Sequence, residues 1–247
     1  MEEAGELLNY LPLSFKTTAE REYIKFLWDA FQTNYTYEKH QFAFLAYHML
    51  TMSFVYFKIW QIKQSEPKDF EICLIGFGRD IEKSLLEAAS PFVFSTVNES
   101  NILRVLKLIA CDNSKIGTYA KLVKDRNESA HSNGNIFYST GAALDLKIAE
   151  ILRVVDEIQS HSKPVIEHCY REFLLQNHDA DEREYPDPAD QIREVLIHGH
   201  YLSQRDIDIC LGLDLSAFAA RPEYTNMREL HAVLVAAYGT GDERGAG

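Results

Sequence analysis

Three side chains within six residues have the types and the spacing to carry out chemistry together. Arg126, Asn127 and His131 lie in the stretch KDRNESAHSNGN, residues 124–135. A histidine can donate or accept a proton near neutral pH, and an arginine stays charged and offers a planar pair of donors that matches phosphate oxygens. These groups suit phosphoryl transfer in which the 2′-hydroxyl of RNA attacks the neighbouring phosphate, with Arg126 stabilising the developing charge and His131 moving the proton. This chemistry requires no metal or other cofactor, and the stretch has no cluster of carboxylates that would hold magnesium.

A single helix can bring the three side chains to one patch. At about 100° per residue, Asn127 and His131 are neighbours one turn apart, and the long side chain of Arg126 can reach the same surface. Gly134 predicts that this helix ends just beyond the histidine. Upstream, apolar residues at helical spacing predict the face that anchors the helix in a core: Ile116, Tyr119, Ala120 and Val123.

Three lysines precede the polar patch on the same predicted helix. Lys115, Lys121 and Lys124 could bind the RNA substrate beside the site. Each of them could equally belong to an ordinary solvated helix face. The patch itself has a non-catalytic interpretation too, in which Arg126 pairs with the neighbouring Asp125 or Glu128 and the histidine merely ends the helix.

The elements that must position this patch are predicted to be helical. Helical periodicity dominates the first 177 residues, and strand-like alternation is scarce. The predicted helices cover about residues 17–33, 38–63, 68–89, 98–110, 115–130 and 142–176, with Pro164 marking a kink or a break in the last one.

The predicted organisation is an all-α bundle followed by a small helical appendage. Residues 1–176 form the bundle, and residues 177–190, which combine a charge run with two prolines, form an acidic linker. Residues 191–239 are expected to form three short helices, and residues 240–247 a flexible tail.

The net charge of −12 is unevenly distributed along the chain. Residues 178–247 contain 14 acidic and 6 basic residues, a balance of −8, so the first 177 residues carry only −4. Residues 202–218 have a pattern like a helix-turn-helix, but the aspartates in it would repel DNA phosphates, which makes DNA an unlikely partner. The appendage is better interpreted as a packing or partner-docking module, which could mask the site.

Cysteine usage and hydropathy indicate a cytoplasmic protein. The four cysteines are widely spaced and form no C-x-x-C pair, which favours reduced thiols over a disulfide framework or a zinc site. The acidic N-terminus lacks the features of a secretory signal. Residues 42–57 carry no formal charge, but sixteen residues are fewer than the roughly 20 that a spanning helix needs, so a buried or dimer-facing helix is expected and no membrane contact.

Two further short motifs predict no function. Gly76 and Gly78 follow an apolar run, but the third glycine of a dinucleotide loop is missing, so close helix packing is the preferred interpretation. His198 and His200 could offer two metal ligands, but no third ligand stands at a suitable spacing, so a structural or surface role is expected and no metal site.

The hexapeptide Arg126-Asn127-x-x-x-His131 resembles the R-x4-H motif of the HEPN superfamily, in which a polar residue, often asparagine, commonly follows the arginine. The all-helical pattern, with the motif between a penultimate and a final long helix, resembles HEPN bundles over residues 17–176. The resemblance implies a metal-independent endoribonuclease, often a toxin or antiviral effector, in which paired motifs form one site across a dimer. It also implies that Arg126, Asn127 and His131 are the catalytic residues and that an antitoxin or regulatory protein is a possible partner.

Chemistry independently favours two copies, because one histidine cannot serve as acid and base at the same moment. The leading hypothesis is therefore a homodimeric ribonuclease that leaves cyclic phosphate ends. The alternative is a HEPN-like bundle that binds a nucleotide or a partner protein without cleaving RNA.

Overall fold

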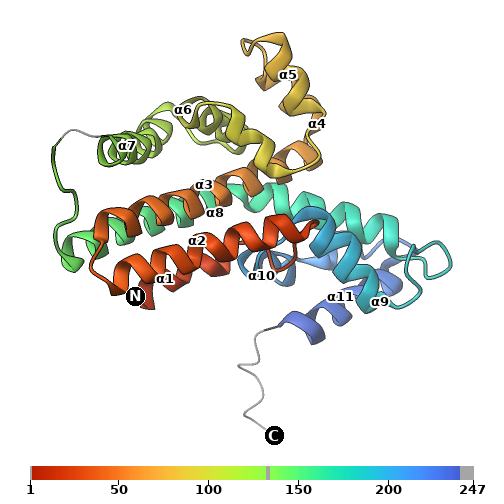
Figure 1. Ribbon diagram of the computed structural model, residues 1–247. Coiled ribbons are helices and arrows are strands. Elements are labelled where there is room, and N and C mark those ends of the chain that lie inside the picture. The colour runs from red at the N-terminus through yellow and green to blue at the C-terminus, as the bar shows by residue number, and fades with distance from the viewer. Residues whose placement is uncertain (1, 132–133, 240–247) are drawn as a thin grey trace, which may run out of the picture.

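The computed structural model describes residues 2–131 and 134–239 and contains only helices, turns and irregular segments within them (Figure 1). The predicted all-α class is confirmed. Residues 240–247, predicted to be a flexible tail, lie outside the described residues.

Long helices run side by side and form the body of the molecule. They are α2 (Thr18–Thr36), α3 (His40–Ser65) and α8 (Gly141–Asn177), with α7 (Asn113–Ala130) packed across α3 (Figure 1). Because α3 is covered on all sides, its side chains are buried around almost its whole circumference. Among the described residues it is the one helix long and apolar enough to cross a membrane, but most of it is buried inside the protein, as in the core helix of a soluble protein.

Local capping signals explain where α2 begins. The Thr17 hydroxyl accepts a hydrogen bond from the Glu20 amide at 3.1 Å, and the Glu20 carboxylate accepts one from the Thr17 amide at 3.1 Å. This reciprocal capping box satisfies two amides that have no partner inside the helix. The expected start at Thr17 is therefore encoded locally.

The single helix predicted over residues 68–89 is wrong, because the chain forms α4 (Pro67–Cys73) and α5 (Arg79–Leu86) instead. Between them Gly76 adopts a φ of 103°, a left-handed conformation that favours glycine and ends a helix. The prediction of close packing at Gly76 and Gly78 is also wrong, since no atom lies within 4 Å of where a Cβ would stand at either. The α5 helix projects from the bundle (Figure 1).

Short helical turns connect α5 to α7. They are η2 (Pro91–Thr96), α6 (Glu99–Ile102) and η3 (Leu103–Ile109), so the helix predicted over residues 98–110 is an α-helical turn that continues as a 3₁₀ helix. By contrast, α8 continues through Pro164 without a break. The exposed position of this proline leaves its ring in solvent rather than in the core.

The C-terminal elements gather around the second half of α8 and share a hydrophobic cluster with it. In chain order they are α9 (Pro188–Gln191), η4 (Ile192–His198), α10 (Gln204–Leu211), η5 (Leu215–Phe218) and α11 (Tyr224–Tyr238). The N-terminal turns α1 (Glu2–Gly5) and η1 (Glu6–Tyr10), which no sequence pattern predicts, pack against α8 and join the main core. The boundaries at residues 176/177 and 190/191 remain predictions.

A buried ion pair fixes the C-terminal elements to the bundle. Lys58 of α3 lies 2.5 Å from the carboxylate of Asp206 in α10, and both side chains are almost fully buried. The same carboxylate accepts hydrogen bonds from Gln61 and Gln159 at 3.0 and 2.8 Å, and from the Ser203 amide at 3.0 Å. Because a buried charge without a partner is strongly destabilising, these contacts specify how α10 docks on α3 and α8.

Candidate functional site

The helix α7 carries the motif and buries one face in the bundle. Its start is capped by the Asp112 side chain, which accepts a hydrogen bond from the Lys115 amide at 2.9 Å. Its buried residues include three of the four apolar positions expected to anchor it and two more: Ile116, Tyr119, Leu122, Val123 and Ser129. Arg126 and Asn127 lie at the edge of this face and are half-buried.

His131 is the first residue after α7, and its side chain is exposed. Its amide donates to the carbonyl of Asn127 at 3.2 Å, and its own backbone is extended, with φ −87° and ψ 146°. The histidine both ends the helix, as the non-catalytic interpretation expects, and remains open to a ligand.

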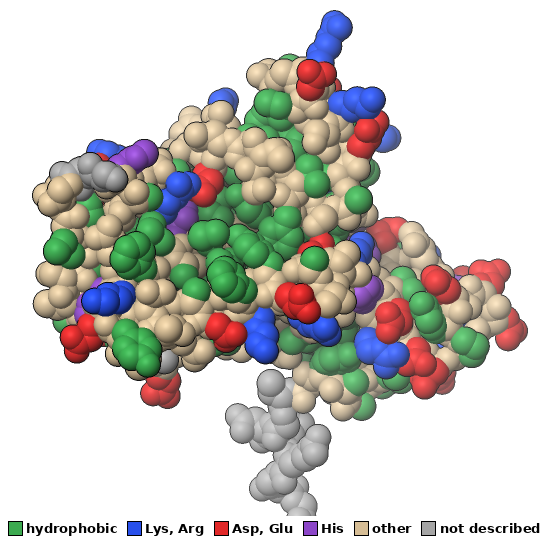
Figure 2. Space-filling view, viewed as in Figure 1, with side chains coloured by type: hydrophobic (Ala, Val, Ile, Leu, Met, Phe, Trp, Pro, Cys, Tyr) green, Lys and Arg blue, Asp and Glu red, His purple; other side chains and the backbone are tan. Residues whose placement is uncertain are grey.

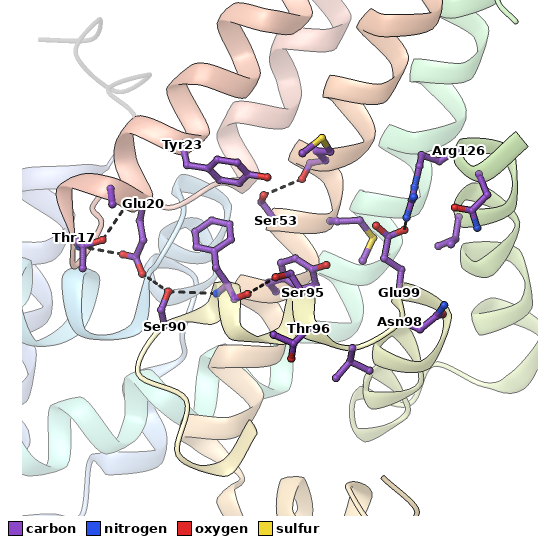
Figure 3. Close-up of a pocket in the computed structure, with 18 residues that line it drawn as sticks. Thr17, Glu20, Tyr23, Ser53, Ser90, Ser95, Thr96, Asn98, Glu99 and Arg126 are labelled. Carbon is purple, nitrogen blue, oxygen red and sulfur yellow. Dashed lines mark hydrogen bonds and ion pairs between the residues drawn. The ribbon is translucent and has the colours of Figure 1, made fainter. Parts of the chain in front are cut away.

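Arg126 pairs with a residue that is distant in sequence. Its Nη2 lies 2.6 Å from Oε2 of Glu99 in the first turn of α6, and the arginine side chain keeps 30% of its surface exposed. The non-catalytic interpretation pairs Arg126 with Asp125 or Glu128, but Asp125 binds Lys147 at 2.6 Å and Glu128 lies 3.7 Å from Lys124. The contact between Arg126 and Glu99 is drawn in Figure 3.

A buried histidine completes this ion pair. Nε2 of His48, in the middle of α3, lies 3.0 Å from the same Oε2 of Glu99, and the His48 side chain is almost wholly buried. Burial raises the pKa of Glu99, but the hydrogen bonds from His48 and Arg126 outweigh it and hold that pKa below the ordinary value of 4.5. Glu99 is therefore a stable anion that holds the guanidinium at the end of α6.

The side chain of Gln41 holds the chain on both sides of His131. The Gln41 side chain of α3 donates to the Ser129 carbonyl at 2.7 Å, and its oxygen accepts from the Phe137 amide at 3.0 Å. One amide thus joins the last turn of α7 to the segment that follows the motif. This contact restrains the backbone on both sides of the histidine.

Arg126 and Asn127 line a large cavity between α2, α3, η2, α6 and α7, with a volume of about 850 Å³. This volume is in the range of small-molecule sites. In Figure 3, Thr17, Glu20 and Ser90 lie at one end, Glu99 and Arg126 at the other, and Tyr23 and Ser53 between them. Figure 2 shows hydrophobic side chains gathered in the middle of the drawn face, between the α6–α7 part and α2. His131 is not among the residues that line the cavity.

The three lysines expected to bind RNA occupy different surroundings. Lys115 pairs with Glu157 of α8, and this hydrogen bond raises the pKa of the lysine. Lys121 is exposed. Lys124 is 74% exposed, 3.7 Å from Glu128, and lies seven residues before His131, so it occupies the same stripe two turns earlier.

Some of the residues around Arg126 could be anticipated from the sequence, and others could not. His48 is the one histidine in the apolar run of residues 42–57, which is a signal for a buried polar contact. Glu99 follows the helix cap Asn98, whose side chain accepts from the Ser100 amide at 3.0 Å, but no local pattern connects Glu99 with Arg126. Gln41 had no signal in the sequence.

The two histidines of the remaining motif, His198 and His200, make contacts within the fold. Nδ1 of His198 lies 2.7 Å from the Ser14 hydroxyl, and His200 is largely buried, which lowers its pKa to about 4. Within residues 2–131 and 134–239, no group of three or more His, Cys, Asp or Glu side chains is arranged to hold a metal ion.

Comparison of the chain with protein-family models, with curated proteins and with solved structures found no match.

Proposed function

We propose that this protein is a metal-independent endoribonuclease of the HEPN type. The observation that carries the proposal is the arrangement on α7, where a half-buried arginine and an amide at the rim of a cavity precede an exposed histidine by one turn. A guanidinium held in place by Glu99 can receive a phosphate without first having to be ordered.

The proposed reaction is an internal transesterification of RNA. The 2′-oxygen attacks the adjacent phosphorus, a new P–O2′ bond forms, and the P–O5′ bond breaks. The 2′-hydroxyl proton passes to a base, an acid protonates the departing 5′-oxygen, and the products carry a 2′,3′-cyclic phosphate and a 5′-hydroxyl. Arg126 stabilises the extra negative charge on the phosphorus oxygens, Asn127 orients the phosphate, and His131 transfers one proton.

The second proton transfer requires a second group. A homodimer that brings two copies of His131 to one phosphate would supply it, and the exposed position of this residue at the end of α7 suits such a contact. In this proposal the protein acts in the cytoplasm as a toxin or phage-defence effector, under the control of an antitoxin or another regulatory protein. Light scattering that gives the mass of a monomer at assay concentration would contradict the dimer.

The experiment that tests the activity is digestion of total RNA in the presence of a chelator. We expect the wild type to cut and to leave cyclic phosphate ends, and the variants Arg126→Ala and His131→Ala to lose at least 100-fold in rate. The matched controls Arg153→Ala and His168→Ala remove the same side chains from exposed positions on α8 and should cut like wild type. Equal cutting by all five proteins would identify a contaminating nuclease and remove the proposal.

The second candidate function is a non-catalytic module that binds a nucleotide or a partner protein. The observation in its favour is the ion pair with Glu99, because a phosphate must compete with this carboxylate for Arg126. It predicts nucleotide binding without RNA cleavage.

A further inference from the structure

The cavity beside Arg126 has walls of different chemistry, and they indicate what it binds. One wall is a face of α3 made by Met49, Met52, Ser53 and Tyr56, which share one side of the helix because of their spacing. Opposite elements contribute two aromatic rings, Tyr23 from α2 and Phe92 from η2, whose centroids lie 5.2 Å apart at 87°. Thioethers and aromatic rings form a largely apolar slot that suits a flat ring.

At one end of the cavity, the carboxylate of Glu20 is already bound by three hydrogen-bond donors. One carboxylate oxygen accepts from the Ser90 hydroxyl at 2.6 Å, the other accepts from the Thr17 amide at 3.1 Å, and the Tyr201 hydroxyl lies 3.0 Å from both. This carboxylate is buried and structural. It closes the slot and does not serve as a cation site.

The other end holds the Arg126 guanidinium paired with the Glu99 carboxylate. The Arg126 guanidinium faces the cavity with the Asn127 amide beside it, and the charge of Glu99 there is shared between Arg126 and His48. Between the two ends, the hydroxyls of Ser95 and Thr96 donate to backbone carbonyls at 2.7 and 2.8 Å and keep lone pairs that can accept hydrogen bonds. The cavity therefore combines an apolar slot, hydrogen-bonding groups along it and an ion-paired guanidinium at one end.

We propose that this cavity is a subsite for one unstacked nucleotide of single-stranded RNA. The base enters the slot against Tyr23 and Phe92, the ribose lies along the hydroxyls, and its phosphate reaches Arg126. This inference rests on the proposed function, because the phosphate held by Arg126 is then the one on which His131 acts. It makes the enzyme selective for unpaired RNA, since a base inside a duplex cannot leave its stack without an energetic penalty.

The first arm of the test measures binding by calorimetry at constant salt. The ligands are AMP, GMP, CMP and UMP, with inorganic phosphate and adenosine as partial ligands and a single-stranded hexanucleotide as the strand. Tyr23→Ala should weaken binding of the best mononucleotide and of the hexanucleotide by about 10- to 100-fold, because stacking on one aromatic ring is lost. Tyr37→Ala, which removes an exposed tyrosine outside the cavity, is the matched control and should bind like wild type.

Two more variants keep the test valid if Tyr23→Ala folds poorly. Tyr23→Phe retains the ring and should retain binding. Met49→Asp changes a side chain that is 43% exposed and places a negative charge in the slot, so it should weaken binding to a similar extent without opening the core. Circular dichroism and thermal melting report whether each variant keeps the fold.

The second arm measures cleavage of a hexanucleotide and of the same sequence in a duplex. The expected result is cleavage of the single strand at least tenfold faster than the duplex, and a KM raised by Tyr23→Ala and Met49→Asp with little change in kcat.

Wild-type binding and cleavage in both variants would overturn the subsite and leave the ribonuclease proposal intact. Nucleotide binding that depends on Tyr23 and Arg126, without RNA cleavage, would overturn the ribonuclease and leave the nucleotide site. If the hexanucleotide does not displace a bound mononucleotide, the cavity binds free nucleotides and the proposal of a subsite for an RNA strand is overturned.

Discussion

Nη2 of Arg126 lies 2.6 Å from Oε2 of Glu99, and these residues are brought together from the last turns of α7 and the first turn of α6. The same carboxylate oxygen is 3.0 Å from Nε2 of the buried His48. The candidate phosphate-binding arginine is thus held by an anion that is itself held by α3. This arrangement gives Glu99 two opposing effects, orientation of the guanidinium and competition with phosphate.

Substitution of Glu99 should separate these two effects. In Glu99→Gln the guanidinium no longer faces a negative charge, so we expect KM for RNA to fall severalfold, while kcat falls because the arginine is less well oriented. Glu87→Gln removes the same charge from an exposed residue that does not line the cavity and should change neither constant. Steady-state cleavage of a hexanucleotide gives both constants, and an unchanged KM would contradict competition.

The stability of the protein in acid should depend on the same carboxylate. Burial raises the pKa of Glu99, but the contacts with His48 and Arg126 hold it below 4.5 in the folded protein. A depressed folded pKa gives a stabilisation that is present above the unfolded pKa and is lost as the pH falls through the folded value. Urea unfolding should therefore show Glu99→Gln less stable than wild type at pH 7, with a difference that shrinks below about pH 4.5. A difference that is constant down to pH 3 would refute this coupling.

The lysines of α7 should differ in their contribution to RNA binding. Lys124 is exposed on the stripe of His131, whereas Lys115 is held by Glu157. For single strands each phosphate contact contributes about 0.7 to the slope of log affinity against log salt. We expect Lys124→Ala to lower this slope by about that amount and Lys115→Ala to leave it unchanged, measured by fluorescence anisotropy between 50 and 200 mM salt. Equal effects of both substitutions would show that the pair with Glu157 opens for RNA.

Removal of the buried carboxylate of Asp206 should destabilise the protein more than removal of the exposed carboxylate of Asp208 in the same helix. Asp206→Ala leaves Lys58 as an unpaired buried charge and removes the acceptor for Gln61 and Gln159, so we expect a loss of about 3–5 kcal/mol in the free energy of unfolding. Asp208→Ala, at an exposed position of the same helix, should change it by less than about 0.5 kcal/mol. Urea denaturation of the two variants compares them directly, and similar midpoints would contradict the role of the pair.

Pro164 offers a stabilising substitution. It stands inside α8 without an amide hydrogen for the helix, yet it is exposed and α8 continues through it. Pro164→Ala should restore the missing hydrogen bond and raise the free energy of unfolding by about 1–3 kcal/mol. The neighbouring exposed Lys163→Ala serves as the control in thermal melts. A lower melting temperature in Pro164→Ala would mean that the fold depends on the shape this proline imposes.

Local chemistry accounts for the parts of the fold that the sequence predicts well. The box formed by Thr17 and Glu20 starts α2, and the apolar spacing on α7 anticipates its buried face. The same reasoning is wrong over residues 68–89, because α4 ends at Cys73 and Gly76, with a φ of 103°, lies outside the helical range.

The helical class, the positions of the long helices and the candidate chemistry of Arg126, Asn127 and His131 can be predicted from the sequence. Helix propensity, capping and the chemistry of side chains are properties of residues close together in the chain. Two pairings became known only from the packed fold: Arg126 is held by Glu99 rather than by an adjacent carboxylate, and Lys58 contacts Asp206, which is 148 residues away in the sequence. Such pairings depend on which helix faces are brought together when the core forms. Periodicity along one segment carries no information about the partner that burial will select.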